Sequence, residues 1–167
     1  HVVRETFHSS LVLAEQALFN ILADDVVDSN WWDLFGGTGA IGIEALSRGA
    51  SFVRFSDLNR APIETIKENV EHCGFTDQAE VRRGDAFAML SAKADKSFEY
   101  IYIAPPQYKE MWVEALKLVD KNMEWLTDDG TVIVQIDPTE YQQIELSNLV
   151  ETEQRKYGST LLIFYDR

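Results

Sequence analysis

The sequence predicts an α/β fold, in which a mostly parallel sheet carries helices on both faces and ends in an antiparallel hairpin. Short apolar runs that suit strands alternate with longer segments that suit helices from residue 31 to residue 136. Such alternation is typical of parallel strands joined by crossover helices. Residues 151–157 and 160–165 have the pattern of two strands joined at Gly158-Ser159, which predicts the closing antiparallel pair.

Length and composition favour one domain over residues 1–167. The chain has 167 residues, 46% of them apolar, which suits one hydrophobic core. It has no apolar run of about 18 residues and no recognisable signal peptide, so we expect a cytoplasmic protein without a membrane span. Cys73 is the only cysteine and the three histidines are scattered, so we expect neither a disulfide nor a metal site. The net charge of −13 is the wrong sign for a nucleic-acid binder.

Five segments have the spacing or the boundary residues of helices. Ser9 or Ser10 could cap the first, whose apolar residues fall on one face. Gly49 and Gly74 stand where glycines end the second and third. The expected helices are residues 9 or 10 to 22, 40–48, 62–73, 109–126 and 138–149.

Seven segments have the length and composition of strands, and a turn at Asp128-Asp129-Gly130 separates the fourth helix from the fifth strand. The expected strands are residues 31–35, 52–56, 79–83, 98–103, 131–136, 151–157 and 160–165.

Residues 31–49 organise the chain as a buried strand, a glycine turn and a helix. Gly36, Gly37 and Gly39 allow a sharp turn and a close approach by a ligand. A helix that opens on glycines presents unpaired N–H groups, which suit an anionic or carboxylate-bearing ligand. Gly37-x-Gly39-x-x-Gly42 matches the dinucleotide fingerprint, although a tight turn without a ligand would give the same pattern.

Asp33 favours S-adenosylmethionine (SAM) over a nicotinamide cofactor. It lies four residues before Gly37, near the end of an otherwise apolar strand. The pattern resembles the acidic SAM-binding turn, whereas nicotinamide-binding turns usually carry an apolar residue there. A carboxylate can accept hydrogen bonds from the ammonium of SAM but would repel a pyrophosphate.

Two further acids follow strands. Asp57 lies 20 residues after Gly37 and could accept both ribose hydroxyls, or could cap the next helix. Asp85 follows the third strand and could accept from the adenine amine, or could belong to an ordinary turn. Because ligands bind at the carboxyl ends of parallel strands, we expect these acids to meet Asp33 at one edge of the sheet.

The fourth strand continues into Ala104-Pro105-Pro106-Gln107-Tyr108. Proline cannot donate a backbone hydrogen bond, so two prolines end the strand and stiffen the loop. Tyr108 could stack on a base or could pack against the following helix.

The chain resembles the RsmD-type 16S rRNA guanine-N2 methyltransferases. Three segments carry most of this likeness: residues 17–22, residues 33–50 and residues 157–162. Arg4-Glu5-Thr6 is similar to an Arg-Pro-Thr segment that the family places over cofactor and substrate. The resemblance implies a Rossmann-like class I SAM-dependent methyltransferase fold with a seven-stranded sheet.

The resemblance also implies the cofactor, the site residues and the partner. SAM would be the cofactor, and the substrate would be rRNA within a small-subunit particle, with no metal ion and no membrane. The implied cofactor-binding residues are Asp33, Phe35, Gly36, Gly37, Thr38, Gly39, Asp57, Leu58, Asp85 and Ala86. The implied catalytic loop is Ala104, Pro105, Pro106, Gln107 and Tyr108, and the implied substrate-binding residues are Arg4, Thr6 and Tyr108.

Two features depart from the family pattern. The basic N-terminal segment that helps to hold RNA is missing from this sequence. Ala104 stands where the family carries Asp or Asn, and Gln107 is inserted before Tyr108. An active rRNA methyltransferase is therefore the main expectation. The alternatives are a SAM-binding module that acts through protein interactions without catalysis, and a methyltransferase for another amine.

Overall fold

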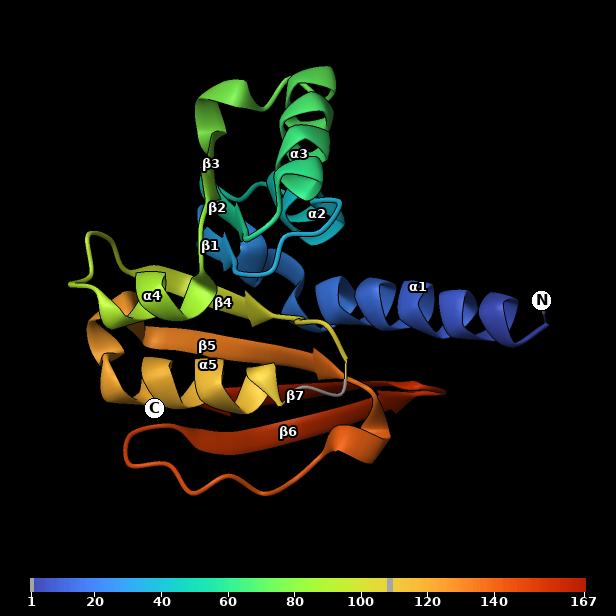
Figure 1. Ribbon diagram of the computed structural model, residues 1–167, viewed down its shortest axis with the longest axis vertical. Coiled ribbons are helices and arrows are strands. Elements are labelled where there is room, and N and C mark those ends of the chain that lie inside the picture. The colour runs from blue at the N-terminus through green and yellow to red at the C-terminus, as the bar shows by residue number, and fades with distance from the viewer. Residues whose placement is uncertain (1, 108–109) are drawn as a thin grey trace.

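A computed structural model of the protein describes the backbone of residues 2–107 and 110–167, and the side chains of this range from Ser10 onward (Figure 1). The helices are α1 (Val2–Leu22), α2 (Ala40–Ser47), α3 (Arg60–His72), α4 (Ala86–Ser91) and α5 (Met111–Lys121). The strands are β1 (Asn30–Asp33), β2 (Phe52–Asp57), β3 (Ala79–Arg83), β4 (Phe98–Ile103), β5 (Leu126–Ile136), β6 (Val150–Tyr157) and β7 (Thr160–Asp166).

The seven strands form one sheet in the order β3-β2-β1-β4-β5-β7-β6. Strands β1 to β5 are parallel, whereas β7 runs antiparallel to both β5 and β6. The predicted fold class is therefore confirmed, including the C-terminal hairpin. The strand order reverses between β1 and β4, and their carboxyl ends form the switch point at which open α/β sheets bind ligands.

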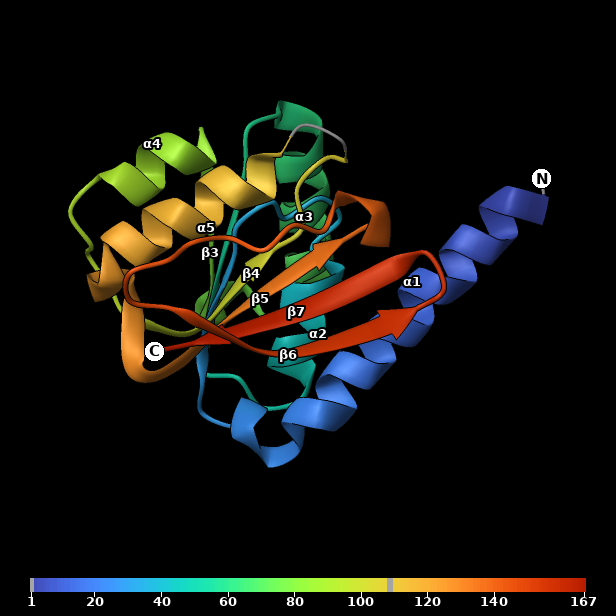
Figure 2. The same cartoon turned by 90° about the horizontal axis from the view of Figure 1, so that it is seen from below.

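Helices cover both faces of the sheet. Helices α4 and α5 lie on one face and α1 on the other, as Figure 2 shows. Successive side chains of a strand point to opposite faces, and the buried pair Trp31 and Trp32 illustrates this. Trp31 packs with α1, α2 and α3, whereas Trp32 packs with α4 and α5. No helix among the described residues is long and apolar enough to cross a bilayer.

The first helix begins earlier than predicted, because Ser10 is not a cap. Helix α1 starts at Val2 and already includes Ser9 and Ser10. The Ser10 hydroxyl is buried and lies 2.9 Å from Ser159 Oγ and 3.1 Å from Thr160 Oγ1, in the turn and first residue of the β6–β7 hairpin. The contact with Ser159, which is 149 residues away in the sequence, thus determines what the Ser10 hydroxyl binds. The local sequence does not reveal this contact.

The fourth predicted helix ends five residues early, and the expected turn after it is absent. Trp125 Nε1 and Asn122 Nδ2 both donate to the carbonyl of Leu90, which holds residues 122–125 against α4. Strand β5 begins at once with Leu126, opposite Phe98. Residues 128–130 lie within β5, where a shift in register makes the strand bulge.

The predicted helix over residues 138–149 is wrong, and a short helix was missed. Only Pro138–Glu140 form one 3₁₀ turn, capped by Asp137. The buried carboxylate of Asp120 accepts hydrogen bonds from the backbone N–H groups of residues 147, 148 and 149, each at 2.8 Å. Because these donors bind Asp120, they cannot close helical turns. Helix α4 was missed because its six residues are too few to show a period.

Candidate cofactor and substrate site

The four predicted site segments all lie at the carboxyl edge of the sheet. Asp33 ends β1, Asp57 ends β2, Asp85 follows β3 and Ala104 follows β4. Parallel pairing of these strands brings their ends to one edge. The sheet thus gathers residues that are up to 71 positions apart in the sequence.

The glycine turn has the conformation that its sequence predicts. Gly37 and Gly39 have φ angles of +58° and +82°, a region that favours glycine. Gly36 N–H donates to the carbonyl of Ser56 at 2.7 Å, and Gly39 N–H donates to the carbonyl of Gly36 at 2.8 Å. A Cβ added to Gly37 would meet no atom within 4 Å, so the turn is open on that side.

Gly42 serves helix packing. A Cβ at this position would lie 2.2 Å from the ring of Phe55 on β2. The absence of a side chain therefore lets α2 lie directly on the sheet, which points its N-terminus at the turn.

Asp33 is a buried acid with a missing partner. Its side chain is 2% exposed, and Oδ2 has no hydrogen-bond partner. The pKa of Asp33 is raised from 3.8 to about 7, chiefly by burial; the hydrogen bond from the Gly42 backbone N–H lowers it, and the nearby carboxylates of Glu15 and Asp57 add smaller increases. A cationic group beside Oδ2 would supply the missing hydrogen bond and would offset the free-energy cost of burying a charged carboxylate.

Asp57 and Asp85 both accept backbone hydrogen bonds, but not as their alternatives predicted: the N-cap residue of α3 is Asn59 rather than Asp57, and Asp85 caps a helix rather than an ordinary turn. Asp57 accepts from Asn59 N–H at 3.0 Å and from Gly37 N–H at 3.2 Å. Asp85 caps α4 by accepting from Phe87 N–H at 3.0 Å. Each carboxylate keeps lone pairs for a ligand, so the ribose and adenine roles remain predictions.

One pocket of about 100 Å³ joins several predicted residues between the ends of β1, β2 and β3. It does not include Asp33, the three glycines or Thr38, which lie beside it on β1 and the turn. The pocket is lined by Leu34, Phe35, Asp57, Leu58, Asn59, Gly84, Asp85, Ala86, Pro106 and Met111. Phe35, Leu58 and Ala86 give this pocket apolar walls, and their cofactor-binding roles remain predictions.

The proline loop leaves β4 toward this pocket. Ala104 and Pro105 are half-buried, and Ala104 packs against the core on the α1 side of the sheet. Pro106 and Gln107 are exposed, and Pro106 lines the pocket. The loop therefore contributes one wall of this pocket at the carboxyl edge of the sheet.

Known proteins match this arrangement over nearly the whole chain. The model of a family described as Conserved hypothetical protein 95 matches residues 12–166. The Bacillus subtilis protein YlbH, named as a candidate rRNA methyltransferase, is 32% identical over 155 residues, which are 92% of this chain and 84% of YlbH. The chain belongs to this family. It is the RsmD-type family that the sequence resembles.

Matches from Escherichia coli give the same result. The Ribosomal RNA small subunit methyltransferase D is 30% identical over 120 residues, which cover 72% of this chain but only 59% of that enzyme. The solved structure of yhhF, described as a candidate methyltransferase, superposes with a TM-score of 0.84 at 26% identity, over 92% of this chain and 85% of that one. The fold is the class I SAM-dependent methyltransferase fold.

The three predicted substrate-binding residues have side chains outside the described part of the structure. Tyr108 lies outside the described residues. Arg4 and Thr6 lie in the first turns of α1, which extend past the sheet (Figure 1), and their side chains are outside the description. Their substrate-binding roles stay predictions.

Sequence reasoning missed three residues that shape the site. Asn69 of α3 donates from Nδ2 to the carbonyl of Thr38 at 3.0 Å, which fixes the glycine turn. Ser56 accepts from Trp32 Nε1 and donates to the carbonyl of Leu34, so it supports the end of β1. Glu15 of α1 brings a second negative charge near Asp33. No local pattern distinguishes these residues, because each acts across elements.

Proposed function

We propose that this chain is a SAM-dependent methyltransferase that methylates the exocyclic N2 of a guanine in small-subunit rRNA. The observation that carries the proposal is the carboxyl edge, where a glycine turn, a buried acid and a proline loop meet in a family that includes rRNA methyltransferases. The guanine N2 specificity rests on the resemblance to the RsmD-type family.

The residues present fit the charged end of SAM. Asp33 Oδ2 is buried and unpartnered, and an ammonium group supplies the hydrogen-bond donor and the positive charge that it lacks. Gly37 is open where a side chain would intrude, and the N-terminus of α2 favours a carboxylate. Asp57 would hold the ribose hydroxyls, and Asp85 would accept from the adenine amine.

When bound, SAM would supply a methyl group whose carbon a nitrogen lone pair can attack in line, so that an N–C bond forms as the C–S bond breaks and S-adenosylhomocysteine leaves. A guanine amine is a poor nucleophile because its lone pair is conjugated with the ring. The loop must therefore hold the amine by its hydrogens and turn the lone pair toward the methyl group. Orientation of this kind provides most of the rate, and the displaced amine proton leaves to water.

Ala104 changes which atoms can orient the amine. Its methyl group cannot accept a hydrogen bond, but the carbonyl oxygens of Ala104 and Pro105 can. Gln107 is exposed and adds an amide oxygen three residues further on. We infer that a backbone carbonyl and Gln107 together replace the family's Asp or Asn.

The charge of the chain favours rRNA that already carries protein. A net charge of −13 opposes binding to bare phosphate. Basic ribosomal proteins on a small-subunit particle would offset this repulsion. The particle is therefore the proposed substrate, in preference to free 16S rRNA.

The test is methyl transfer from radiolabelled SAM to unmethylated small-subunit particles and to bare 16S rRNA, measured side by side. We expect transfer to the particle, slower transfer to bare rRNA, and label on guanine N2 after nuclease digestion. Label on another atom would contradict the guanine assignment while leaving the methyltransferase intact.

Ala104 also favours a second function, a SAM-binding module without catalysis. The variant Ala104→Asn distinguishes the two, because it restores the acceptor that the family pattern carries. If the chain binds SAM but neither it nor Ala104→Asn labels any particle, the enzyme proposal fails and the binding module stands.

A further inference from the structure

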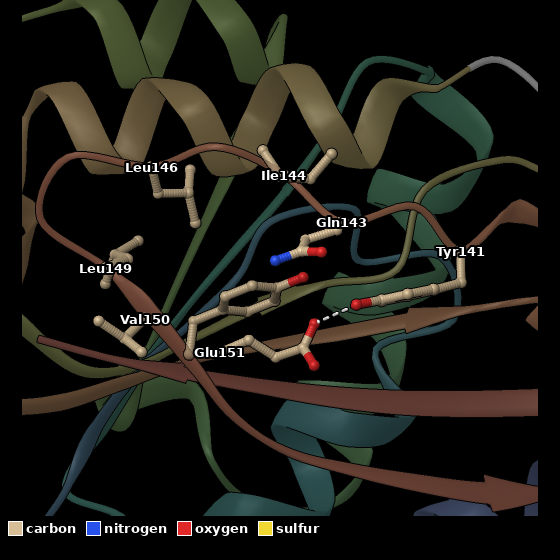
Figure 3. A pocket seen from close by; sticks show the side chains of 8 residues that line it. Tyr141, Gln143, Ile144, Leu146, Leu149, Val150 and Glu151 are labelled. Carbon is tan, nitrogen blue, oxygen red and sulfur yellow. Dashed lines mark hydrogen bonds between the residues drawn. The ribbon is translucent and has the colours of Figure 1, made fainter.

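A second pocket lies on the α5 face of the sheet, apart from the carboxyl edge (Figure 3). Its volume is about 350 Å³. The loop over residues 141–149 forms one wall with Ile144, Leu146 and Leu149, and the start of β6 forms another with Val150 and Glu151. None of these residues belongs to the predicted cofactor or catalytic set, so the pocket has no assigned role.

Tyr165 lines this pocket with a hydroxyl that lacks a partner. The residue is 1% exposed, yet its Oη has no hydrogen-bond partner. Glu151 is the cross-strand partner of Tyr165 in the β6–β7 pair, so their side chains share one face. Burial raises the pKa of Tyr165, and the negative charge of Glu151 raises it further, so the phenol stays neutral. A buried hydroxyl without a partner can form a hydrogen bond with a polar group that enters the pocket.

Glu151 supplies the charge of the pocket. Its Oε1 accepts from the Tyr141 hydroxyl at 2.7 Å, and its Oε2 accepts from Gln154 Nε2 at 2.9 Å (Figure 3 shows the former). Each oxygen keeps a lone pair. The carboxylate is thus held in place while still able to accept from a further donor.

The stretch of chain that surrounds the pocket is acidic. Residues 122–154 contain eight Asp and Glu and no Lys, Arg or His. The eight acids are Glu124, Asp128, Asp129, Asp137, Glu140, Glu145, Glu151 and Glu153. This stretch provides the loop and the β6 side of the pocket. Arg155 pairs with Glu153 and Arg167 lies 3.9 Å from Asp128, but the acids outnumber these two arginines, so the field there attracts cations and repels phosphate.

We propose that this pocket binds an arginine side chain of a basic polypeptide partner. A guanidinium group is a planar donor, so it can bond Glu151 and the Tyr165 hydroxyl together and stack on a tyrosine ring. The side chain of Val150 is 60% exposed at the rim, which offers an apolar contact to the residues next to the arginine. Among the described strands, none pairs with the outer edge of β6, so an extended segment can lie along it.

The proposal does not depend on methyl transfer. It concerns a different surface from the cofactor edge, and binding is measured without SAM. A single-stranded RNA is disfavoured as the occupant because its phosphates would face Glu151 and the acidic stretch.

The experiment measures calorimetric binding of the capped peptide Gly-Arg-Gly-Arg-Gly and of the same peptide with citrulline in place of arginine. Citrulline keeps the shape and removes the charge. We expect the arginine peptide to bind and the citrulline peptide to bind at least about tenfold more weakly, because hydrogen bonds to charged groups are each worth that much or more.

Two variants of the pocket and one matched control locate the site. Glu151→Gln and Tyr165→Phe should each weaken the arginine peptide by about tenfold. Tyr165→Phe removes only an unpartnered hydroxyl, and thermal unfolding checks that both variants stay folded. Glu145→Gln removes the same charge from the adjacent loop at a residue that does not line the pocket, and should change the affinity less than twofold.

Three results would each overturn the proposal. They are no binding of the arginine peptide, equal binding of the citrulline peptide, and equal weakening by Glu145→Gln and Glu151→Gln. The last would mean diffuse attraction to an acidic surface. Competition by a short single-stranded RNA with the arginine peptide at this pocket would also overturn it, in favour of a nucleic-acid site.

Discussion

The carboxylate of Asp57 accepts a hydrogen bond of 3.2 Å from the backbone N–H of Gly37, although the two residues are 20 positions apart. The same side chain accepts from Asn59 N–H at 3.0 Å. Asp57 thus joins the glycine turn to the start of α3. A residue that was predicted to hold a ligand also shapes the turn on which that ligand would rest.

Replacing Asp57 should therefore weaken SAM binding. In Asp57→Ala, two hydrogen bonds to ribose are lost, which costs roughly 1–3 kcal/mol if each is worth about 0.5–1.5 kcal/mol. Calorimetric titration with SAM measures the loss. Asp77→Ala is the matched control, because Asp77 lies in a 3₁₀ turn before β3, away from the carboxyl edge. Unchanged affinity in a folded Asp57→Ala protein would remove Asp57 from the ribose site.

The pH dependence of SAM binding should report Asp33. Burial raises the pKa of Asp33 to about 7 in the free protein. Below that pH its carboxyl is mostly protonated and neutral, while an ammonium group prefers the carboxylate. The affinity should therefore rise about tenfold per pH unit on approaching pH 7 and level off above it. A flat profile between pH 5 and 8 would mean that no cation meets Asp33.

Asp33→Asn should abolish the pH dependence of SAM affinity. It should also abolish a pH dependence of the free energy of unfolding that has the same cause. A carboxyl with a raised folded-state pKa stabilises the fold below its unfolded pKa of 3.8, and that stabilisation is lost as pH rises toward 7. From this group alone, the free energy of unfolding should fall by about 1.4 kcal/mol per pH unit in that window. Urea unfolding of the parent and of Asp33→Asn, without ligand, measures the difference.

Gln107 should matter for turnover and leave SAM binding unchanged. If its amide has replaced the family's acceptor, Gln107→Ala should lower the methyl-transfer rate by about 10²–10³, the usual loss for one contact to a transition state. Single-turnover rates on small-subunit particles measure this. Gln78→Ala, also an exposed glutamine but in a turn before β3, is the control. Equal rates for the two variants would leave orientation to the backbone carbonyls alone.

Asp120 should be important for stability. It is 7% exposed, and its carboxylate accepts three backbone N–H groups from the loop that precedes β6. Asp120→Ala leaves these donors unpaired, so the free energy of unfolding should fall by about 2–5 kcal/mol. Urea unfolding is the measurement, and the exposed Asp129→Ala should change it by less than about 0.5 kcal/mol. Similar losses in both variants would contradict the role assigned to Asp120.

The sequence by itself determined the succession of strands along the chain, the glycine turn and the residues at the strand ends. These features follow from local properties: Gly37 and Gly39 take positive φ angles that other residues avoid, and residues 98–103 have the length and the aromatic and β-branched residues typical of a buried strand. The parallel arrangement then places Asp33, Asp57 and Asp85 at one edge without further information.

Only the tertiary structure decided where several elements begin and end. Ser10 continues a helix because a hairpin 149 residues away takes its hydroxyl, and residues 147–149 leave the helical path because the Asp120 carboxylate binds their N–H groups. Tertiary packing also buries the side-chain oxygens of Asp33 and Tyr165. It keeps water away from these oxygens and leaves them without a hydrogen-bond partner. Burial and long-range hydrogen bonds depend on which residues meet in space, and periodicity along the chain carries no record of that.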